Sequence, residues 1–381
     1  MLHVSSTVFD EFDILIIRTS IDKALVNMSS VSWIAAEDLG SWDAFVLRHP
    51  LGLAYHLSAW RSVLEGTFDH IRGKIVVVKD ENGEIRSGLP IYNIRSWLLK
   101  NRTVSVPFAT FCDPLISSRE DFILLWKAVE EMARESGSRR IEIRTRRMDS
   151  NLIPAPLVAG ARYKHHYLPL SGSIDELFRR LHPSCIRRRL QQAKRTGLTV
   201  ERRQDIQSVR CLHSLLVATR RRLGLPPIPV DLFEAAFRYL SSDRVGVYLA
   251  ISRGTPVGGA LAVKFKDMWT AEYSGHADGA PPGTDQYVYW HMIECAKNSG
   301  AASFSFGRTS LDNQGLLDYK RRWATIEEDL TDYVAYPGRT PRATESAKTV
   351  HPAFYLSARL LRYTPTHIQK CFGDFCYRHL G

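Results

Sequence analysis

The chain has 381 residues, of which 44% are apolar and 24% charged, a composition that excludes an intrinsically disordered chain. This length is sufficient for two domains of ordinary size, each with its own core. The formal net charge of +11 favours a polyanionic partner, such as a phosphate-bearing substrate, tRNA or an anionic membrane surface.

Neither a secretory leader nor a membrane span is indicated. Residues 1–13 lack a basic region, and the apolar run at 14–17 is far shorter than the ~20 residues of a spanning helix. The six cysteines (residues 112, 185, 211, 295, 371 and 376) show no metal-ligand or disulfide spacing, so no metal is expected. We expect a cytoplasmic protein that is either soluble or held at a membrane surface.

The two halves of the chain repeat one order of elements after an N-terminal extension (1–35) with a weak strand at 12–18. In the first half, helices are predicted at 41–48, 55–68 and 122–135, and strands at 74–79, 85–94, 102–107 and 140–144. In the second half, helices are predicted at 184–196, 205–223, 231–240 and 285–298, and strands at 245–252, 255–266, 268–275 and 302–306. The segment 130–147 matches 293–310 as helix, Ser-Gly cap and strand, which indicates an internal duplication.

This order predicts an α/β fold with two mixed sheets, each covered by helices. The domain limits that follow are 36–158 and 159–336, with the boundary near the Pro-rich residues 151–160, and a tail at 337–381. Within the tail, residues 353–363 form an amphipathic pattern with Arg359 and Arg362. Such a helix lies on an anionic membrane or packs back onto the second domain.

The stretch 303–323 (SFSFGRTSLDNQGLLDYKRRW) contains the most informative pattern. A short strand ends at Gly307, Arg308 follows at once, and a polar loop leads to a helix with Tyr319 and Lys320. Because a strand end and a helix lie so close in sequence, we expect Arg308 and Lys320 to reach one pocket.

This stretch resembles the last block of the FemABX-like branch of the GNAT acyltransferases, with Tyr319-Lys320 as the aromatic-Lys pair and Ser305 where the family usually has Asp. Segments 53–68, 105–116 and 182–198 resemble further blocks of the same branch, closest to FemAB-like proteins encoded with exopolysaccharide and PEP-CTERM systems. The resemblance implies tandem GNAT-like domains, a short C-terminal helical extension, and an active cleft mainly in the second domain. It also implies that Lys320 stabilises the reaction centre, where a fixed cation would favour the tetrahedral oxyanion of acyl transfer. Arg308 would anchor a phosphate or carboxylate, and Tyr319 would shape the pocket.

Two further groups are candidates for substrate binding. The helix at 184–196 is strongly cationic, and its Arg187, Arg188 and Lys194 either bind phosphates or form a solvated face. The unit 273–289 supplies possible cleft residues: Tyr273, His276, Asp285, Gln286 and Tyr289. GNAT enzymes that use acyl-CoA have a Gly-rich turn here, but this chain has Gly-Ala-Pro-Pro-Gly at 279–283, in which two prolines lack N–H donors.

These features predict an N-acyltransferase that moves an acyl or aminoacyl group onto an amine of a cell-envelope or exopolysaccharide precursor. No tightly bound cofactor is expected, and the donor is aminoacyl-tRNA or acyl-CoA. No nucleophile relay motif is visible, so the acceptor amine would attack the donor directly. The alternatives are a non-catalytic protein that binds an anionic polymer or an assembly partner, and a nucleic-acid-binding protein.

Overall fold

The computed structural model describes residues 30–153, 156–338 and 366–380. The strands of the first half are β1 (Ser30–Trp33), β2 (Ile71–Lys79), β3 (Ile85–Ile94), β4 (Arg102–Val104) and β5 (Arg140–Thr145). Those of the second half are β6 (Val158–Pro169), β7 (Thr199–Arg203), β8 (Val245–Ser252), β9 (Thr255–Phe265), β10 (Met268–His276), β11 (Ser303–Ser310) and β12 (Ile326–Ala335).

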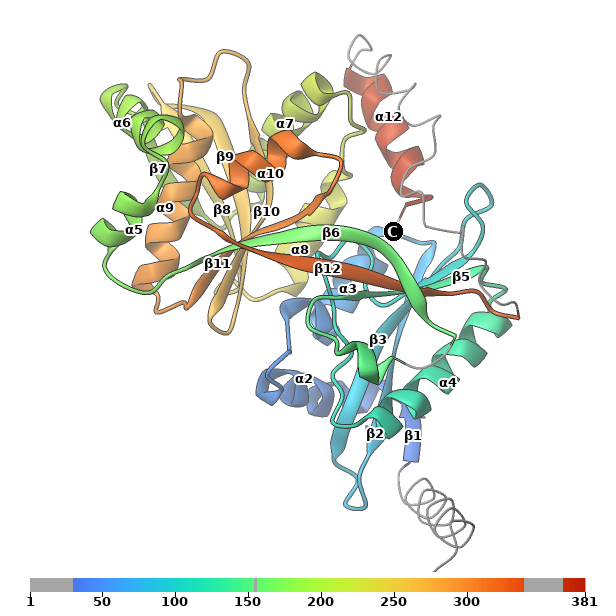
Figure 1. Cartoon of the computed structure of the whole chain (residues 1–381). Coiled ribbons are helices and arrows are strands. Elements are labelled where there is room, and N and C mark those ends of the chain that lie inside the picture. Colours follow the sequence, from blue (N-terminus) through green and yellow to red (C-terminus); the bar gives the residue numbers. More distant parts are fainter. Residues whose placement is uncertain (1–29, 154–155, 339–365, 381) are drawn as a thin grey trace, which may run out of the picture.

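These strands form one 12-stranded sheet in the order β1-β2-β3-β4-β5-β12-β6-β11-β10-β9-β8-β7 (Figure 1). The sequence predicted two separate sheets. The two are joined because β12 lies between β5 and β6 and pairs antiparallel with both. Figure 1 shows β6 and β12 as a long ribbon that runs from the second half of the molecule to the first.

The duplicated order of elements is present in both halves. In the first, β2, β3 and β4 are antiparallel neighbours, and the helix α4 (Arg119–Glu135) leads from β4 to the parallel strand β5. In the second, β8, β9 and β10 repeat this arrangement, and α9 (Thr284–Asn298) leads to the parallel strand β11. The fold is therefore mixed α/β with two related units.

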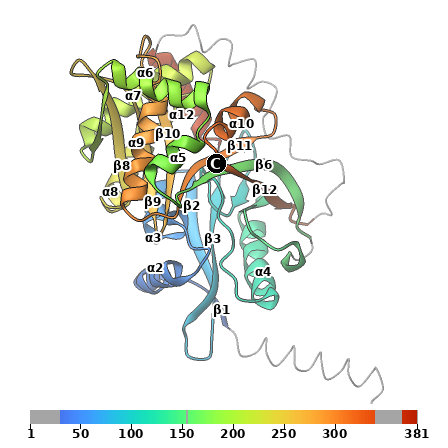
Figure 2. The ribbon, with the colours of Figure 1, turned by 60° about the vertical axis from the view of Figure 1, so that its left-hand side comes forward.

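Helices cover both faces of the sheet (Figure 2). On one face, a core that spans both halves packs under α2 (Leu39–Arg48), α3 (Ser58–Thr67), α7 (Ile206–Leu223) and α8 (Val230–Tyr239). On the other face, α4 covers the first half. There the second half carries α5 (Ile174–Arg180), a π-helical turn η4 (Pro183–Arg187), α6 (Arg188–Arg195), α9 and α10 (Gln314–Arg321). The short 3-10 turns are η1 (Ala36–Asp38), η2 (Ala54–His56) and η3 (Ser150–Leu152), and the last helix is α12 (Thr366–Tyr377).

Most predicted elements agree with the structure to within a few residues, and β3 and β8 have the predicted bounds. Sequence analysis missed β6 because charged and polar residues, Lys164, His165 and His166 among them, interrupt its apolar pattern. The predicted elements at 12–18 and 353–363 lie outside the described residues, and the domain limits remain a prediction. No helix in the described ranges is both long and apolar enough to cross a bilayer.

Candidate active site

The strands β10 and β11 separate along their length and leave a wedge between them. They pair in parallel only where Met268–Thr270 faces Ser303–Ser305, although β10 continues to His276 and β11 to Ser310. Each strand also has an irregularity just beyond this point, between Ala271 and Tyr273 in β10 and between Ser305 and Arg308 in β11. Because bulges re-aim side chains, both strands can direct polar groups into the wedge.

Glu272 lies within the β10 bulge and accepts a hydrogen bond from the hydroxyl of Tyr55 in η2. Its side chain is half-buried, and burial raises its pKa to about 7. A carboxyl group with a pKa near neutrality can both take and return a proton, as general acid-base catalysis requires. Sequence analysis missed Glu272 because an isolated Glu in a strand has no recognisable motif.

Aromatic rings line the side of the wedge that faces α9 and α10. Tyr289 of α9 stacks on Phe306 with ring centroids 5.5 Å apart and an interplanar angle of 3°, and its hydroxyl donates to Ser274 Oγ at 3.3 Å. Tyr319 of α10 lies edge-on to Trp323 at 6.3 Å. Burial raises the pKa of Tyr289 to about 12, so its phenol stays neutral and available as a hydrogen-bond donor.

Lys320, at the end of α10, is buried against the bulge of β11. Its Nζ donates to the backbone oxygens of Gly307 at 3.0 Å and of Arg308 at 3.3 Å. Gly307 has a φ of +70°, which a residue without Cβ adopts at little cost. Among the described residues Lys320 forms no ion pair with a carboxylate, and burial lowers its pKa to about 7. At neutral pH the Lys320 side chain is therefore divided between its ammonium and its neutral amine form.

Arg308 does not join Lys320 in one pocket. Its guanidinium lies over the ring of Tyr163 at 4.3 Å, and Nη1 is 3.7 Å from Asp332 Oδ2. Tyr163 belongs to the core under α3, α7 and α8, whereas Lys320 approaches from α10 on the opposite face. The expected convergence fails because the β11 bulge shifts the alternation of side chains between Ser305 and Arg308.

Arg308 instead belongs to a buried charge cluster that extends across the neighbouring strands β5, β12, β6 and β11. Glu142 Oε1 lies 2.9 Å from Arg144 Nε, and Glu142 Oε2 lies 2.9 Å from Arg140 Nη2. Burial would raise the pKa of Glu142, but the two guanidinium groups outweigh it and lower the pKa to about 2. Burial and the charge of Glu142 raise the pKa of Asp332 to about 6. These contacts assign Arg308 to the junction of the halves.

The β10–α9 turn brings together His276 and Asp285, whose Nδ1 and Oδ2 are 2.9 Å apart, with Gln286 half-buried beside them. Tyr273 points away into the opposite core, where its ring lies 5.0 Å from Phe233. Of the residues predicted for this unit, Tyr289 reaches the wedge, and the His276–Asp285 pair marks its open end at the start of α9.

The same turn is a poor cradle for a diphosphate. Pro281 and Pro282 have no N–H, and the N–H of Thr284 donates to the oxygen of Pro281 at 3.2 Å. Gly283, with a φ of +92°, packs so closely on α6 that a Cβ there would lie 2.2 Å from the oxygen of Arg189. The turn therefore offers fewer N–H donors than a Gly-rich loop would, and α6 packs closely against it at Gly283.

The cationic helix lies beside α9 as η4 and α6. Arg188 and Lys194 are exposed and Arg187 is half-buried, and none of the three forms an ion pair within the part of the chain that the structure describes. The turn η4 begins next to the end of α10, since the N–H of His182 donates to the oxygen of Arg322 at 3.0 Å. The structure thus places a cationic surface next to the helix that carries Lys320.

Residues 184–321, which include β10, α9, β11 and α10, match the family model described as the acetyltransferase (GNAT) domain. This stretch of the chain is therefore a GNAT domain, and the protein is an acyltransferase by the domain it carries. No curated protein resembles the chain closely enough in sequence to count as a match.

Solved structures share the fold over most of the chain. FemX superposes with a TM-score of 0.65 at 15% identity, over 79% of this chain and 96% of FemX. A tandem GNAT protein from the clavulanic acid biosynthesis pathway superposes with a TM-score of 0.53 at 11% identity, over 82% of this chain and 100% of that protein. The C-terminal domain of a putative lysylphosphatidylglycerol synthetase from Agrobacterium fabrum superposes with a TM-score of 0.51 at 17% identity, over 78% of this chain and 92% of that domain. At these identities the likeness establishes the fold alone, which the chain shares with FemX and with a tandem GNAT protein.

Proposed function

We propose that the protein transfers an acyl or aminoacyl group to the amine of a cell-envelope or exopolysaccharide precursor, and that the β10–β11 wedge is its active site. The observation that supports this most is the presence of Glu272 and Lys320 on the two sides of the wedge, both with a pKa of about 7. An acidic and a basic group whose pKa values are both shifted towards 7 are typical of acid-base sites rather than of structural ion pairs.

In the proposed reaction the acceptor nitrogen attacks the carbonyl carbon of an ester or thioester donor. A C–N bond forms, the C–O or C–S bond breaks, and the proton of the attacking nitrogen passes to the Glu272 carboxylate. The ammonium of Lys320 would stabilise the oxyanion, since a preorganised cation acts most strongly in a site that excludes water. The proton held by Glu272 then returns to the leaving oxygen or sulfur.

For the donor we favour aminoacyl-tRNA over acyl-CoA. Two residues of the β10–α9 turn, Pro281 and Pro282, have no N–H for a diphosphate, whereas Arg188 and Lys194 offer exposed cations to a phosphate-rich molecule. A domain of a putative lysylphosphatidylglycerol synthetase has this fold, which is consistent with an aminoacyl group. Arg187, Arg188 and Lys194 would hold the donor phosphates.

The experiment supplies purified protein with either a mixture of charged tRNAs or a set of acyl-CoA thioesters, together with amino-sugar and peptide amines. Acyl transfer by the wild type and its loss in Glu272→Gln support the proposal. Ligand binding without turnover by the wild type, for every donor, would instead identify a non-catalytic binding protein. Arg188→Gln with Lys194→Gln should weaken tRNA binding and leave the chemistry of a small ester donor unchanged.

A further inference from the structure

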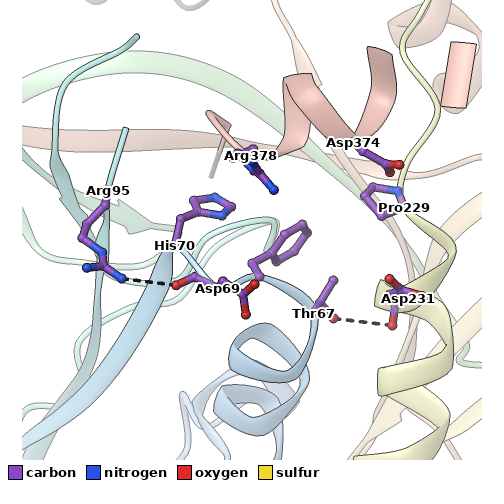
Figure 3. Close-up of a pocket in the computed structure, with 9 residues that line it drawn as sticks. Thr67, Asp69, His70, Arg95, Pro229, Asp231, Asp374 and Arg378 are labelled. Carbon is purple, nitrogen blue, oxygen red and sulfur yellow. Dashed lines mark hydrogen bonds between the residues drawn. The ribbon is translucent and has the colours of Figure 1, made fainter. Parts of the chain in front are cut away.

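A cavity of about 530 Å³ lies away from the wedge, where the two halves meet α12 (Figure 3). Its walls come from the loop between α3 and β2, the end of β3, the start of α8, and α12 itself. Phe68 separates it from the interior, because this ring packs on Phe108 at 5.1 Å and Phe108 packs on Tyr377 at 5.6 Å. These rings thus form the inner wall of the cavity.

Charged side chains of both signs line the cavity, and they are exposed to solvent. Arg95 and Arg378 lie on the side of His70, and Asp231 and Asp374 lie on the side of Pro229 (Figure 3). None of these four side chains forms an ion pair within residues 30–153, 156–338 and 366–380. Arg95 Nη2 donates to the backbone oxygen of Asp69 at 3.4 Å, and Asp69 also lines the cavity. Because arginine and aspartate side chains lie on opposite sides of the cavity, this lining is complementary to a molecule with an anionic group and an ammonium group.

An exposed apolar surface borders the same elements. We name it the Trp97 patch, and its members are Trp97 (72% exposed), Leu98 (50%), Leu99 (38%), Ile368 (47%) and Phe375 (44%). Trp97 lies two residues after Arg95 and touches α12, with ring centroids 6.4 Å apart between Trp97 and Phe375. Phe375 is the neighbour of Asp374 on that helix, so the patch adjoins the cavity.

The loop that carries the patch is held in a fixed conformation. The N–H of Leu99 donates to Ser96 Oγ at 2.9 Å, and the N–H of Ser96 donates to Asn101 Oδ1 at 3.2 Å. Ser96 Oγ is also 3.0 Å from His379 Nδ1, which ties the loop to the segment that follows α12. A loop held by hydrogen bonds thus exposes three large apolar side chains to solvent. Contiguous exposed apolar surface is typical of interaction sites.

We propose that the Trp97 patch docks on a bilayer and that the cavity binds the headgroup of an aminophospholipid. The phosphate would bind Arg95 and Arg378, and the primary ammonium would bind Asp231 and Asp374. Asp374 and Arg378 are four residues apart on α12, and side chains with this spacing lie ~5 to 6 Å apart at Cβ, which suits the short spacer between an ammonium and its phosphate. Trp97 and Phe375 would enter the interfacial region, as exposed aromatic residues of membrane-bound proteins do. This inference is independent of the chemistry proposed for the wedge.

Flotation of the full chain with vesicles tests the docking surface. The vesicles contain phosphatidylcholine alone, or phosphatidylcholine mixed with phosphatidylethanolamine or with phosphatidylglycerol. We expect binding to the phosphatidylethanolamine vesicles to persist at raised salt, whereas charge-driven binding to phosphatidylglycerol falls as salt screens it. Trp97→Ser should abolish flotation with all vesicles, and Leu223→Ser, at a 57% exposed leucine of α7, should not change it.

The cavity is tested separately with Asp374→Asn and Arg378→Gln. Asp374→Asn should reduce the affinity for phosphatidylethanolamine vesicles roughly tenfold and leave binding to phosphatidylglycerol unchanged, because only the ammonium contact is lost. Calorimetry with soluble glycerophosphoethanolamine should give the same loss, and there Trp97→Ser should have no effect. Equal flotation with phosphatidylcholine and phosphatidylethanolamine, an unaltered Asp374→Asn protein, or a dimer that Trp97→Ser dissociates would overturn the proposal.

Discussion

The hydroxyl of Tyr55 in the first half donates a hydrogen bond to the carboxyl group of Glu272 in the second half. These residues are far apart in sequence, and each lies at an irregular point of the backbone, η2 for Tyr55 and the β10 bulge for Glu272. The ionisation of the candidate base is therefore set by both halves of the molecule. The first half would thus support the active site that we propose in the second half.

Tyr55→Phe should move the acid limb of the pH–rate profile to higher pH. The hydroxyl lowers the pKa of Glu272 against the larger effect of burial, so its removal raises that pKa above its present value of about 7. A larger share of the carboxyl group is then protonated at pH 7 and unable to accept a proton. The measurement is kcat/KM between pH 5 and 9 for both proteins, and an acid limb that stays in place would refute the contact.

Lys320→Met should reduce kcat by ~10² to 10³ with little change in KM, because the cation acts on charge that develops in the transition state. In the wild type the rate should fall as pH rises above about 7, where Lys320 loses its proton. Lys320→Arg should retain activity at high pH, since a guanidinium stays protonated. Lys127→Met, at an exposed lysine of α4, is the control and should match the wild type.

Glu272→Gln should stabilise the fold at pH 8. The folded state raises the pKa of Glu272 from 4.5 to about 7, so it binds the proton more tightly than the unfolded chain does. The stability associated with this group is complete below pH 4.5 and is lost as pH rises through 7. Urea unfolding at pH 5 and pH 8 should show that the free energy of unfolding of the wild type falls by on the order of 1 to 3 kcal/mol because of this group, whereas that of the variant does not. An equal pH dependence in both proteins would argue against a buried carboxyl.

Glu142→Gln should destabilise the protein by ~3 to 5 kcal/mol, because it removes the carboxylate that pairs with the buried guanidinium of Arg144. The matched control is Glu130→Gln, which removes an ion pair with Arg134, a residue 56% exposed, and should cost under ~1 kcal/mol. Denaturant midpoints measure both. Similar losses for the two variants would show that the cluster is solvated.

Gly283→Ala should destabilise the packing of α6 on α9. The residue has a φ of +92°, and its Cβ would lie 2.2 Å from the oxygen of Arg189, so the two helices must move apart. Gly279→Ala is the control, because its φ is +74° but no atom lies within 4 Å of its Cβ. Gly279→Ala should lower the free energy of unfolding only by the ~1 to 2 kcal/mol that the left-handed conformation costs a residue with a Cβ. Thermal unfolding of both variants separates this conformational cost from the steric cost at Gly283.

Sequence reasoning reached the elements more fully than the site. Strands such as β3 and β8 have apolar patterns that fix their bounds, and the repeated order of elements revealed the duplication. Lys320, Tyr319 and Tyr289 were identified as candidates, and the structure places all three along the wedge. Glu272 was missed, and Arg308 was expected to share a pocket with Lys320, because a bulge changes which side a residue occupies and leaves no mark in the sequence.

The position of β12 has a consequence for biosynthesis. Residues 326–335 fill the gap between β5 and β6, yet they leave the ribosome after all the other strands. Until then, two strand edges with unpaired amides stay open in the middle of the nascent sheet, and such edges recruit other chains. A polypeptide that stops short of residue 326 should therefore aggregate during translation, and the covering of those edges should be a late step on the ribosome.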